Sequence, residues 1–136
     1  MNRTFKIRKL HEIIMSQLRI PTAHTPAELP PMPIDPAWIQ EGTPTACGAV
    51  LTQSQDKLLS SGFWSCTAGK FQWVFSWDEF VCILEGEVTI REEGGATHTL
   101  KAGDVAHFPR GLTTFWHVPK YVRKFFTLRT LEPFNL

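Results

Sequence analysis

Three aromatic residues alternate along one short segment of the chain, and an acidic residue follows two positions later. They are Trp73, Phe75, Trp77 and Glu79. Side chains two residues apart on a β-strand point to the same face, so the three rings should share one face. Rings of this kind stack on small, partly apolar molecules, and a carboxyl group beside them can donate a proton as the acid or accept one as the carboxylate. The pattern predicts either a ligand-binding face or rings that only fill a core.

A second group of candidate residues lies toward the C-terminus. Thr114 and Trp116 share a face of another expected strand, where they would add a hydroxyl and an indole. Arg123 and Lys124 are adjacent, so one of them could reach a ligand as a carboxylate anchor while the other faces solvent. Glu79 has an alternative role as a structural carboxylate that is bonded to strand ends or to a buried amine.

These candidates fall in a region that should consist of β-strands. Short segments rich in aromatic and β-branched residues are each bounded by glycine or by a charged turn, which is typical of an antiparallel sandwich or barrel. Residues 93–96 and 101–104 have the glycines expected of tight turns. The predicted strands cover Ala49–Leu51, Gly62–Thr67, Phe71–Trp77, Phe80–Glu85, Glu87–Glu92, Thr97–Lys101, Val105–Phe108, Thr113–Val118 and Arg123–Leu128.

Residues 1–45 are expected to form an N-terminal arm, and residues 46–136 a single barrel domain. Apolar residues recur at spacings close to three and four over Thr4–Leu18, which predicts a short amphipathic helix. The stretch Pro21–Pro44 contains seven of the ten prolines. It should therefore run extended over a surface without a regular element, anchored by Trp38.

Composition excludes several classes of partner. A chain of 136 residues with 43% hydrophobic and 20% charged residues can bury one core. Its 14 basic and 13 acidic residues give a net charge of +1, so the chain has no large excess of positive charge to attract nucleic acid. No run approaches the ~18 apolar residues of a membrane span. We therefore expect neither a nucleic-acid nor a membrane partner, and a small molecule as the ligand.

Two stretches of the chain resemble the conserved motifs of the cupin superfamily. The first, Gly69–Gly86, ends in the run ILEG, and the second, Gly103–Val118, has its glycine, proline and glycine at matching positions. The resemblance implies an all-β, double-stranded β-helix (jelly-roll) barrel, here with a short N-terminal helix and a proline-rich arm. The finer pattern is similar to the cupin domain of ureidoglycine aminohydrolase, whose small relatives are often dimeric, so a homodimer is expected. The triplet that ends in Lys124 recurs in that group, which favours Lys124 over Arg123 as the inward side chain.

The same resemblance implies a metal site whose ligands are mostly replaced. A standard cupin binds a divalent metal through three histidines and a glutamate. The three histidine positions correspond to Trp73, Phe75 and Thr114, and only Glu79 keeps its expected type. Indole and phenyl rings have no lone pair for a metal, so we expect no metal and no other cofactor. The face that looks into a cupin barrel would then be aromatic.

The remaining histidines and cysteines form no ligand set that the sequence reveals. His107 and His117 are the only histidines that a local bulge could turn toward the barrel interior. Cys47, Cys66 and Cys82 are odd in number and contain no Cys-x-x-Cys pair, which argues against a disulfide framework and favours the cytoplasm. There is no nucleophile elbow, phosphate-binding loop or dinucleotide fingerprint.

Three functions remain open from the sequence. The first is a metal-free cupin that binds a small organic metabolite; its ligand contacts would be Trp73, Phe75, Thr114 and Trp116. The second is an aminohydrolase of the ureidoglycine type, acting on a ureido or amino acid with Glu79 and Lys124 as the catalytic residues. The third is a non-catalytic structural dimer module with a filled barrel.

Overall fold

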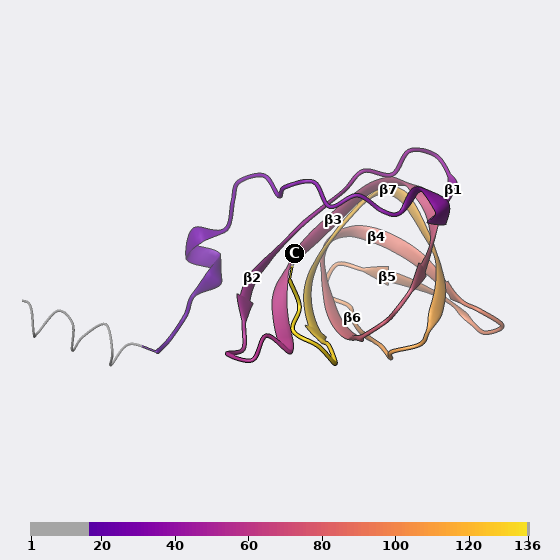
Figure 1. Ribbon diagram of the computed structural model, residues 1–136. Helices are drawn as coiled ribbons and strands as arrows, with labels where there is room; N and C mark the ends of the chain where they lie inside the picture. The colour runs from indigo at the N-terminus through magenta and orange to yellow at the C-terminus, as the bar shows by residue number, and fades with distance from the viewer. Residues whose placement is uncertain (1–16, 136) are drawn as a thin grey trace, which may run out of the picture.

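The computed structural model describes residues 17–135, and every structural statement below refers to them. Its strands belong to one antiparallel sheet in the order β1-β3-β7-β4-β5, with β2 paired to β3 and β6 paired to β4. The sheet curls on itself into a barrel (Figure 1), which confirms the all-β prediction. The strands are β1 Ile39–Glu41, β2 Ala46–Gln53, β3 Leu59–Val74, β4 Asp78–Glu92, β5 Thr97–Lys101, β6 Val105–Phe108 and β7 Thr113–Arg129.

Four strands are longer than the sequence pattern indicated: β2, predicted over Ala49–Leu51, and the three long strands of the barrel. Each of β3, β4 and β7 joins two segments that were predicted as separate strands. Shifts of register in the ladders let a strand bend without ending its hydrogen bonds. Gly86 lies at one shift in β4, with φ of +74°, and an added Cβ would lie 1.9 Å from the carbonyl oxygen of Tyr121. Glycine there continues the strand rather than ending it.

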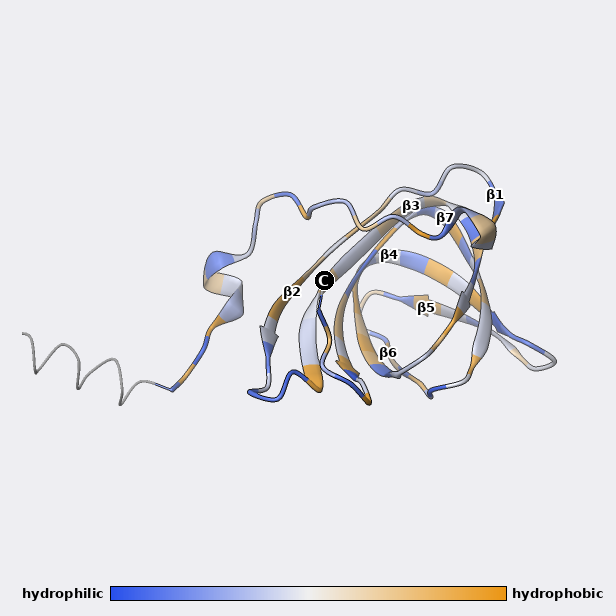
Figure 2. Cartoon of the chain, in the orientation of Figure 1, coloured by the Kyte–Doolittle hydropathy of each residue, from blue (hydrophilic) through white to orange (hydrophobic). Residues whose placement is uncertain are grey.

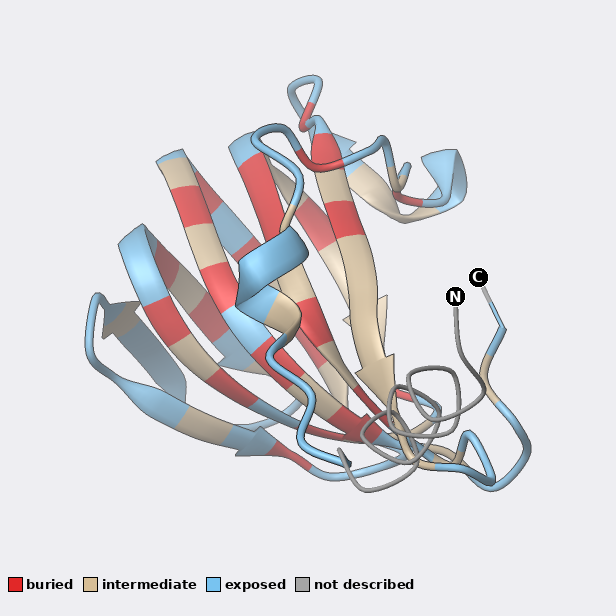
Figure 3. Ribbon diagram, turned by 90° about the vertical axis from the view of Figure 1, so that its left-hand side faces the viewer, coloured by how far each residue is buried: buried red, intermediate tan, exposed pale blue. Residues whose placement is uncertain are grey.

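A bulge in β3 decides which of its side chains point inward. Buried and exposed residues alternate along the strands (Figure 3), as expected for a sheet with one face on a core. The register of β3 against β7 shifts between Thr67 and Gly69. The inward residues before the shift include Trp64, and those after it include Phe71 and Trp73. Trp64 and Phe71 are an odd number of residues apart, a spacing that places side chains on opposite faces of a regular strand. Because of the bulge, both nevertheless point to the inner face.

The hydrophobic core lies inside the barrel, and the turns are polar. Figure 2 shows the hydrophilic turn between β2 and β3 at the foot of the barrel, with most apolar residues on the strands. The core is rich in aromatic rings, which stack or meet edge to face. Phe75 stacks on Phe108 with ring centroids 4.6 Å apart, and Phe71 stacks on Trp116 at 5.7 Å. These contacts fix several rings of the predicted aromatic face.

The proline-rich segment lies along the barrel and contributes one strand. It contains two 3₁₀ turns, Pro21–His24 and Pro36–Trp38, and then β1, which pairs with β3. The prediction that this segment has no regular element is wrong at β1, because residues 37–43 contain no proline and can join a sheet edge. Trp38 packs edge to face on Trp73 at 5.1 Å.

The predicted N-terminal helix over Thr4–Leu18 falls almost wholly outside the described residues. Gln17 and Leu18, its last two residues, are not helical. Within residues 17–135, no helix is long and apolar enough to cross a membrane.

Candidate functional site

A cavity of about 220 Å³ opens into the barrel beside the inner faces of β3, β4 and β7. Its wall is almost entirely apolar and holds four of the five tryptophans. One acidic and one basic side chain interrupt the apolar surface. The lining residues are Met32, Trp64, Phe71, Trp73, Phe75, Trp77, Glu79, Trp116, Lys124, Phe126, Leu128 and Phe134.

The turn between β3 and β4 positions two of the aromatic residues. Phe75 is held by two backbone hydrogen bonds, since its N–H donates to Leu112 O at 2.9 Å and its O accepts from Gly111 N at 2.7 Å. The Phe75 ring is fully buried, whereas Trp73 and Trp77 are half-buried. The turn therefore carries the Phe75 ring into the core and leaves the Trp77 indole beside the cavity, where Trp73 from the end of β3 also lies.

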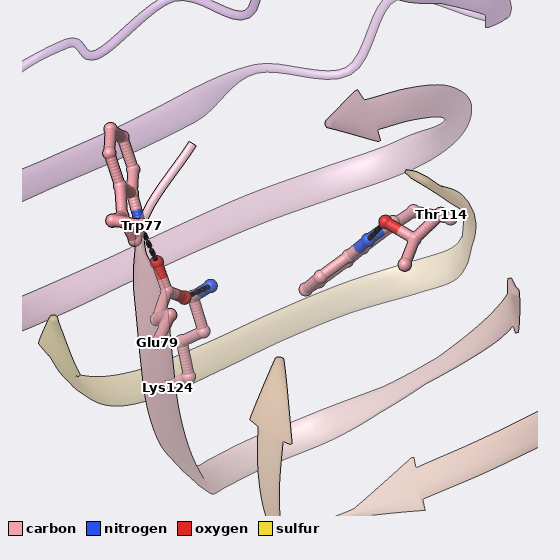
Figure 4. A network of polar contacts seen from close by, with 5 residues as sticks. Trp77, Glu79, Thr114 and Lys124 are labelled. Atoms are coloured by element: carbon pink, nitrogen blue, oxygen red, sulfur yellow. Dashed lines mark hydrogen bonds and ion pairs between the residues drawn. The ribbon is translucent and has the colours of Figure 1, made fainter. Parts of the chain in front are cut away.

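Glu79 and Lys124 form a buried ion pair in the cavity wall. Lys124 Nζ donates to Glu79 Oε2 at 2.6 Å, and the two residues are only 6% and 4% exposed. The second carboxylate oxygen, Oε1, accepts from the Trp77 indole nitrogen Nε1 at 3.0 Å (Figure 4). Arg123, the neighbour of Lys124, points to the outer face, where it covers the Phe63 ring. Of the two roles considered for Glu79, it thus has the bond to a buried amine.

Two indoles cover the Lys124 ammonium. Its Nζ lies 4.7 Å from the centre of the Trp64 ring and 5.0 Å from that of Trp116. Both distances are within the range of cation–π attraction. Trp64 was not predicted as a site residue, because the bulge in β3 hides that it shares a face with Trp73. In the structure it faces Lys124 across the β3–β7 ladder.

Thr114 does not line the cavity itself, but it is hydrogen-bonded to two residues that do. Its Oγ1 donates to Trp73 O at 2.8 Å and accepts from the indole nitrogen of Trp116 at 2.8 Å. Thr114 is completely buried. Its hydroxyl is thus engaged in holding Trp73 and Trp116. For this reason Thr114, which is labelled in Figure 4, does not enter the ligand contacts proposed below.

Two other lining residues come from chain segments outside the central strands. Met32 belongs to the proline-rich segment, and its N–H donates to Ala46 O at 2.9 Å. Phe134 follows β7; its N–H donates to Lys57 O at 3.0 Å, and its ring meets Trp77 at 5.5 Å. Both are half-buried. No local pattern predicts either residue, because their positions depend on how the two ends of the chain fold back on the barrel.

Neither candidate histidine reaches the cavity. His107 lies on the outer face of β6, bonded to Asp78 Oδ1 at 3.2 Å and stacked on Phe80 at 4.3 Å. His117 is exposed on β7. Two hydrogen bonds lower the pKa of the Asp78 carboxyl. The larger effect comes from the bond to His107 and the smaller from the backbone N–H of Arg110.

The residues at the cupin metal positions do not fit a metal. Trp73 and Phe75 offer rings without a donor atom, and the Thr114 hydroxyl already makes two hydrogen bonds. The Glu79 carboxylate is shared between Lys124 and Trp77. Among residues 17–135, no group of three or more His, Cys, Asp or Glu side chains is placed to hold a metal ion.

The buried thiol of Cys66 is poorly suited to act as a nucleophile. Cys66 lies on β3, two residues from Trp64, and is completely buried. Burial raises the pKa of the Cys66 thiol to about 12, against a smaller opposite effect of the Lys124 charge. A thiolate, the form that attacks electrophiles, is therefore disfavoured at this position.

Solved structures with related sequences share the fold. A protein of unknown function from Pseudomonas syringae pv. tomato, of the DUF861 family, is 27% identical, with a TM-score of 0.68 over 75% of this chain and 44% of its own. A putative ethanolamine utilization protein Q from Salmonella typhimurium is 29% identical, with a TM-score of 0.55 over 69% of this chain and 72% of its own. The barrel is therefore a cupin fold.

Curated relatives match the same region of sequence. The protein called acetate kinase EutQ of Salmonella typhimurium is 34% identical over 74 residues, which is 54% of this chain and 32% of that protein. This chain thus spans about a third of the length of that relative. Residues 53–126 match the EutQ-like cupin domain, and they include the ion pair and the four cavity tryptophans. On this match the chain belongs to the family of EutQ-like cupin domains.

Proposed function

We propose that this cupin binds a small, largely apolar organic molecule in the cavity beside Lys124. The observation that supports this most is a space of about 220 Å³ walled by aromatic rings, with a buried charged pair in the wall. A barrel that served only as a scaffold would fill such a space with side chains. The volume lies below the roughly 300–1,000 Å³ of pockets for drug-sized ligands, so the ligand should be a compact metabolite.

The side chains of the cavity wall indicate more closely which class of ligand would fit. Ring faces of Trp73, Trp77 and Trp116 favour a planar or branched apolar body. An ammonium group has three N–H donors, and among the described residues Lys124 has one acceptor, Glu79. A carbonyl or carboxylate oxygen on the ligand would accept a further bond from Lys124. Cationic ligands are disfavoured, because the positive charge of Lys124 already lies over the Trp64 and Trp116 rings.

The family suggests a physiological setting for this binding. We propose a role connected with ethanolamine utilization, which rests only on the names of the related proteins. The kinase activity in one of those names belongs to a protein three times longer than the matched region. Phosphoryl transfer depends on several groups that neutralise phosphate charge, and this cavity has one lysine already paired with a carboxylate.

Intrinsic tryptophan fluorescence tests the binding proposal directly. Four of the five tryptophans line the cavity, and the fifth, Trp38, packs on one of them. A panel of small carboxylates, aldehydes, alcohols and amines should contain compounds that change the emission in a saturable way. A ligand at about 100 times its Kd should add about 2.7 kcal/mol to stability and raise Tm by roughly 10 °C.

A variant with a filled cavity provides the control. Leu128 lines the cavity and is 3% exposed, so Leu128→Phe should fill part of the space and abolish the fluorescence response. Phe80→Leu, on the outer face, should leave the response unchanged. If no compound in the panel alters emission or Tm, the binding proposal is wrong.

A second candidate function is hydrolysis of the ureidoglycine type. What favours it is that Glu79 and Lys124, the two residues proposed to assist, lie 2.6 Å apart at a cavity. Ureidoglycine incubated with the protein, with and without manganese, would then release ammonia above the spontaneous rate. Glu79→Gln should remove this excess, and equal rates with and without protein would dispose of the hypothesis.

We also propose that the protein is a cytoplasmic homodimer. Its three cysteines are free, as suits a reducing compartment. The outer face of β4, β6 and β7 exposes Phe80, Val105 and Phe125, which are 51%, 75% and 37% exposed. A patch of this kind marks an interaction surface, and a twofold interface pairs one surface with itself. Light scattering should give twice the chain mass for the wild type and the chain mass for Phe80→Asp.

A further inference from the structure

The Lys124–Glu79 pair has no evident structural task. Strands β4 and β7 are already joined by a ladder that runs from Asp78 and Arg129 to Glu92 and Thr114. A buried ion pair adds little net stability, because removing two charges from water offsets most of their attraction. Among the lysines of residues 17–135, Lys124 alone is buried. Placing this amine in an apolar cavity costs desolvation free energy that the ion pair does little more than offset. A chemical role for the amine would account for its position.

The geometry provides an amine, a proton acceptor and free space together. Glu79 Oε2 lies 2.6 Å from Lys124 Nζ, so a proton can pass directly from the ammonium to the carboxylate. Once it has lost that proton, a lysine amine in apolar surroundings is a nucleophile toward carbonyl carbon. Both side chains line the 220 Å³ cavity, so a compact ligand would lie against the amine.

The neighbouring indoles hold the amine in place for this reaction. Trp64 and Trp116 cover Nζ at 4.7 and 5.0 Å, and Thr114 fixes the Trp116 indole through a hydrogen bond of 2.8 Å. Trp77 donates to the other carboxylate oxygen of Glu79, which orients Oε2 toward Lys124. Positioning of this kind lowers the entropy that a bimolecular reaction must lose.

We propose that Lys124 condenses with a small aldehyde or ketone to form a Schiff base. This inference rests on the binding function proposed above and names its ligand class. Glu79 takes a proton from the ammonium, and the free amine adds to the carbonyl carbon, giving a carbinolamine. The protonated Glu79 then gives that proton to the hydroxyl, the C–O bond breaks, and water leaves. The product is a protonated imine on Lys124 beside the regenerated Glu79 carboxylate, with the total charge unchanged.

Reductive trapping tests this step. The full chain is incubated with benzaldehyde and sodium cyanoborohydride, which reduces an imine to a stable secondary amine, and the adducts are located by peptide mass mapping. The expected result is one dominant adduct at Lys124, formed at least roughly tenfold faster than at the exposed Lys120. Lys124→Arg, which keeps the cation and the ion pair, should lose this adduct. Glu79→Gln should slow it by about 10²-fold, the usual contribution of a general acid–base.

A competitor keeps the test valid if a variant does not fold. Benzyl alcohol has the same ring and no carbonyl, so it should quench the cavity tryptophans and slow trapping of the wild-type protein. Binding of benzyl alcohol without a Lys124 adduct would overturn the Schiff base and leave the binding function standing. An adduct rate at Lys124 no higher than at Lys120 would also overturn it. If neither benzyl alcohol nor any other compound of the panel binds, the proposed function itself fails.

Discussion

Removing the ammonium of Lys124 should destabilise the protein far more than the loss of a surface charge. Lys124→Met leaves the Glu79 carboxylate 4% exposed and without its counter-ion. Breaking a buried pair costs about 3–5 kcal/mol. The Trp77 indole would still donate to Glu79, so we expect about 3 kcal/mol. Urea unfolding followed by fluorescence measures this loss as a lower midpoint with an unchanged slope.

A double-mutant cycle isolates the pair from other effects of the substitution. Glu79→Gln in the Lys124→Met background removes the uncompensated charge and keeps an oxygen that can accept from Trp77. The double variant should therefore recover about 2 kcal/mol relative to Lys124→Met alone. A loss below about 1 kcal/mol for Lys124→Met, typical of an exposed ion pair, would refute the reasoning. So would purely additive effects of the two substitutions.

Three further outcomes follow from particular residues. Gly86→Ala should lower the unfolding free energy by about 2 kcal/mol or more in urea titration, because φ is +74° and the new Cβ would strike Tyr121; a loss under about 0.5 kcal/mol would contradict this. Cys66 should react slowly with a thiol reagent at pH 8 in the native protein, because it is buried and its pKa is raised to about 12. If Cys66 were labelled as fast in the native protein as in the urea-unfolded protein, its burial would be disproved. The pKa of Asp78 is lowered by its bond from His107, so its stabilising effect is present above the unfolded value of 3.8 and is lost as pH falls through the folded value. Asp78→Asn should consequently flatten part of the acid-side fall in Tm, and an unaltered Tm profile would show that the bond adds nothing.

Strand alternation predicted the right aromatic residues, although the strand ends earlier than expected. Trp73, Phe75 and Trp77 all line the cavity, but β3 ends at Val74, so the turn and not the strand carries Phe75 and Trp77 there. Trp64 escaped prediction because the bulge between Thr67 and Gly69 changes the parity of the inward face. A strand pattern read from one segment at a time cannot reveal a bulge, which depends on the pairing partner.

Contacts between distant segments were beyond a local reading of the sequence. The cavity includes Met32 and Phe134, which are brought there by backbone bonds to Ala46 and Lys57. Trp73 and Trp116 were expected near Thr114, but the sequence did not reveal that its hydroxyl bonds to both of them and is turned away from a ligand. The all-β class was predictable from the turn glycines and the short strand-forming segments, whereas the cupin fold was inferred from the resemblance of two stretches to the cupin motifs.

The most direct test of ligand binding is the set of tryptophan indole N–H signals in a ¹H–¹⁵N correlation spectrum. Titration with benzyl alcohol should shift the signals of Trp64, Trp73, Trp77 and Trp116 together, and more than that of Trp38. The Trp77 signal should move most, because its indole donates to Glu79 at the cavity wall. Shifts confined to residues of the outer face, or no indole shifts at millimolar benzyl alcohol, would contradict a ligand-binding barrel.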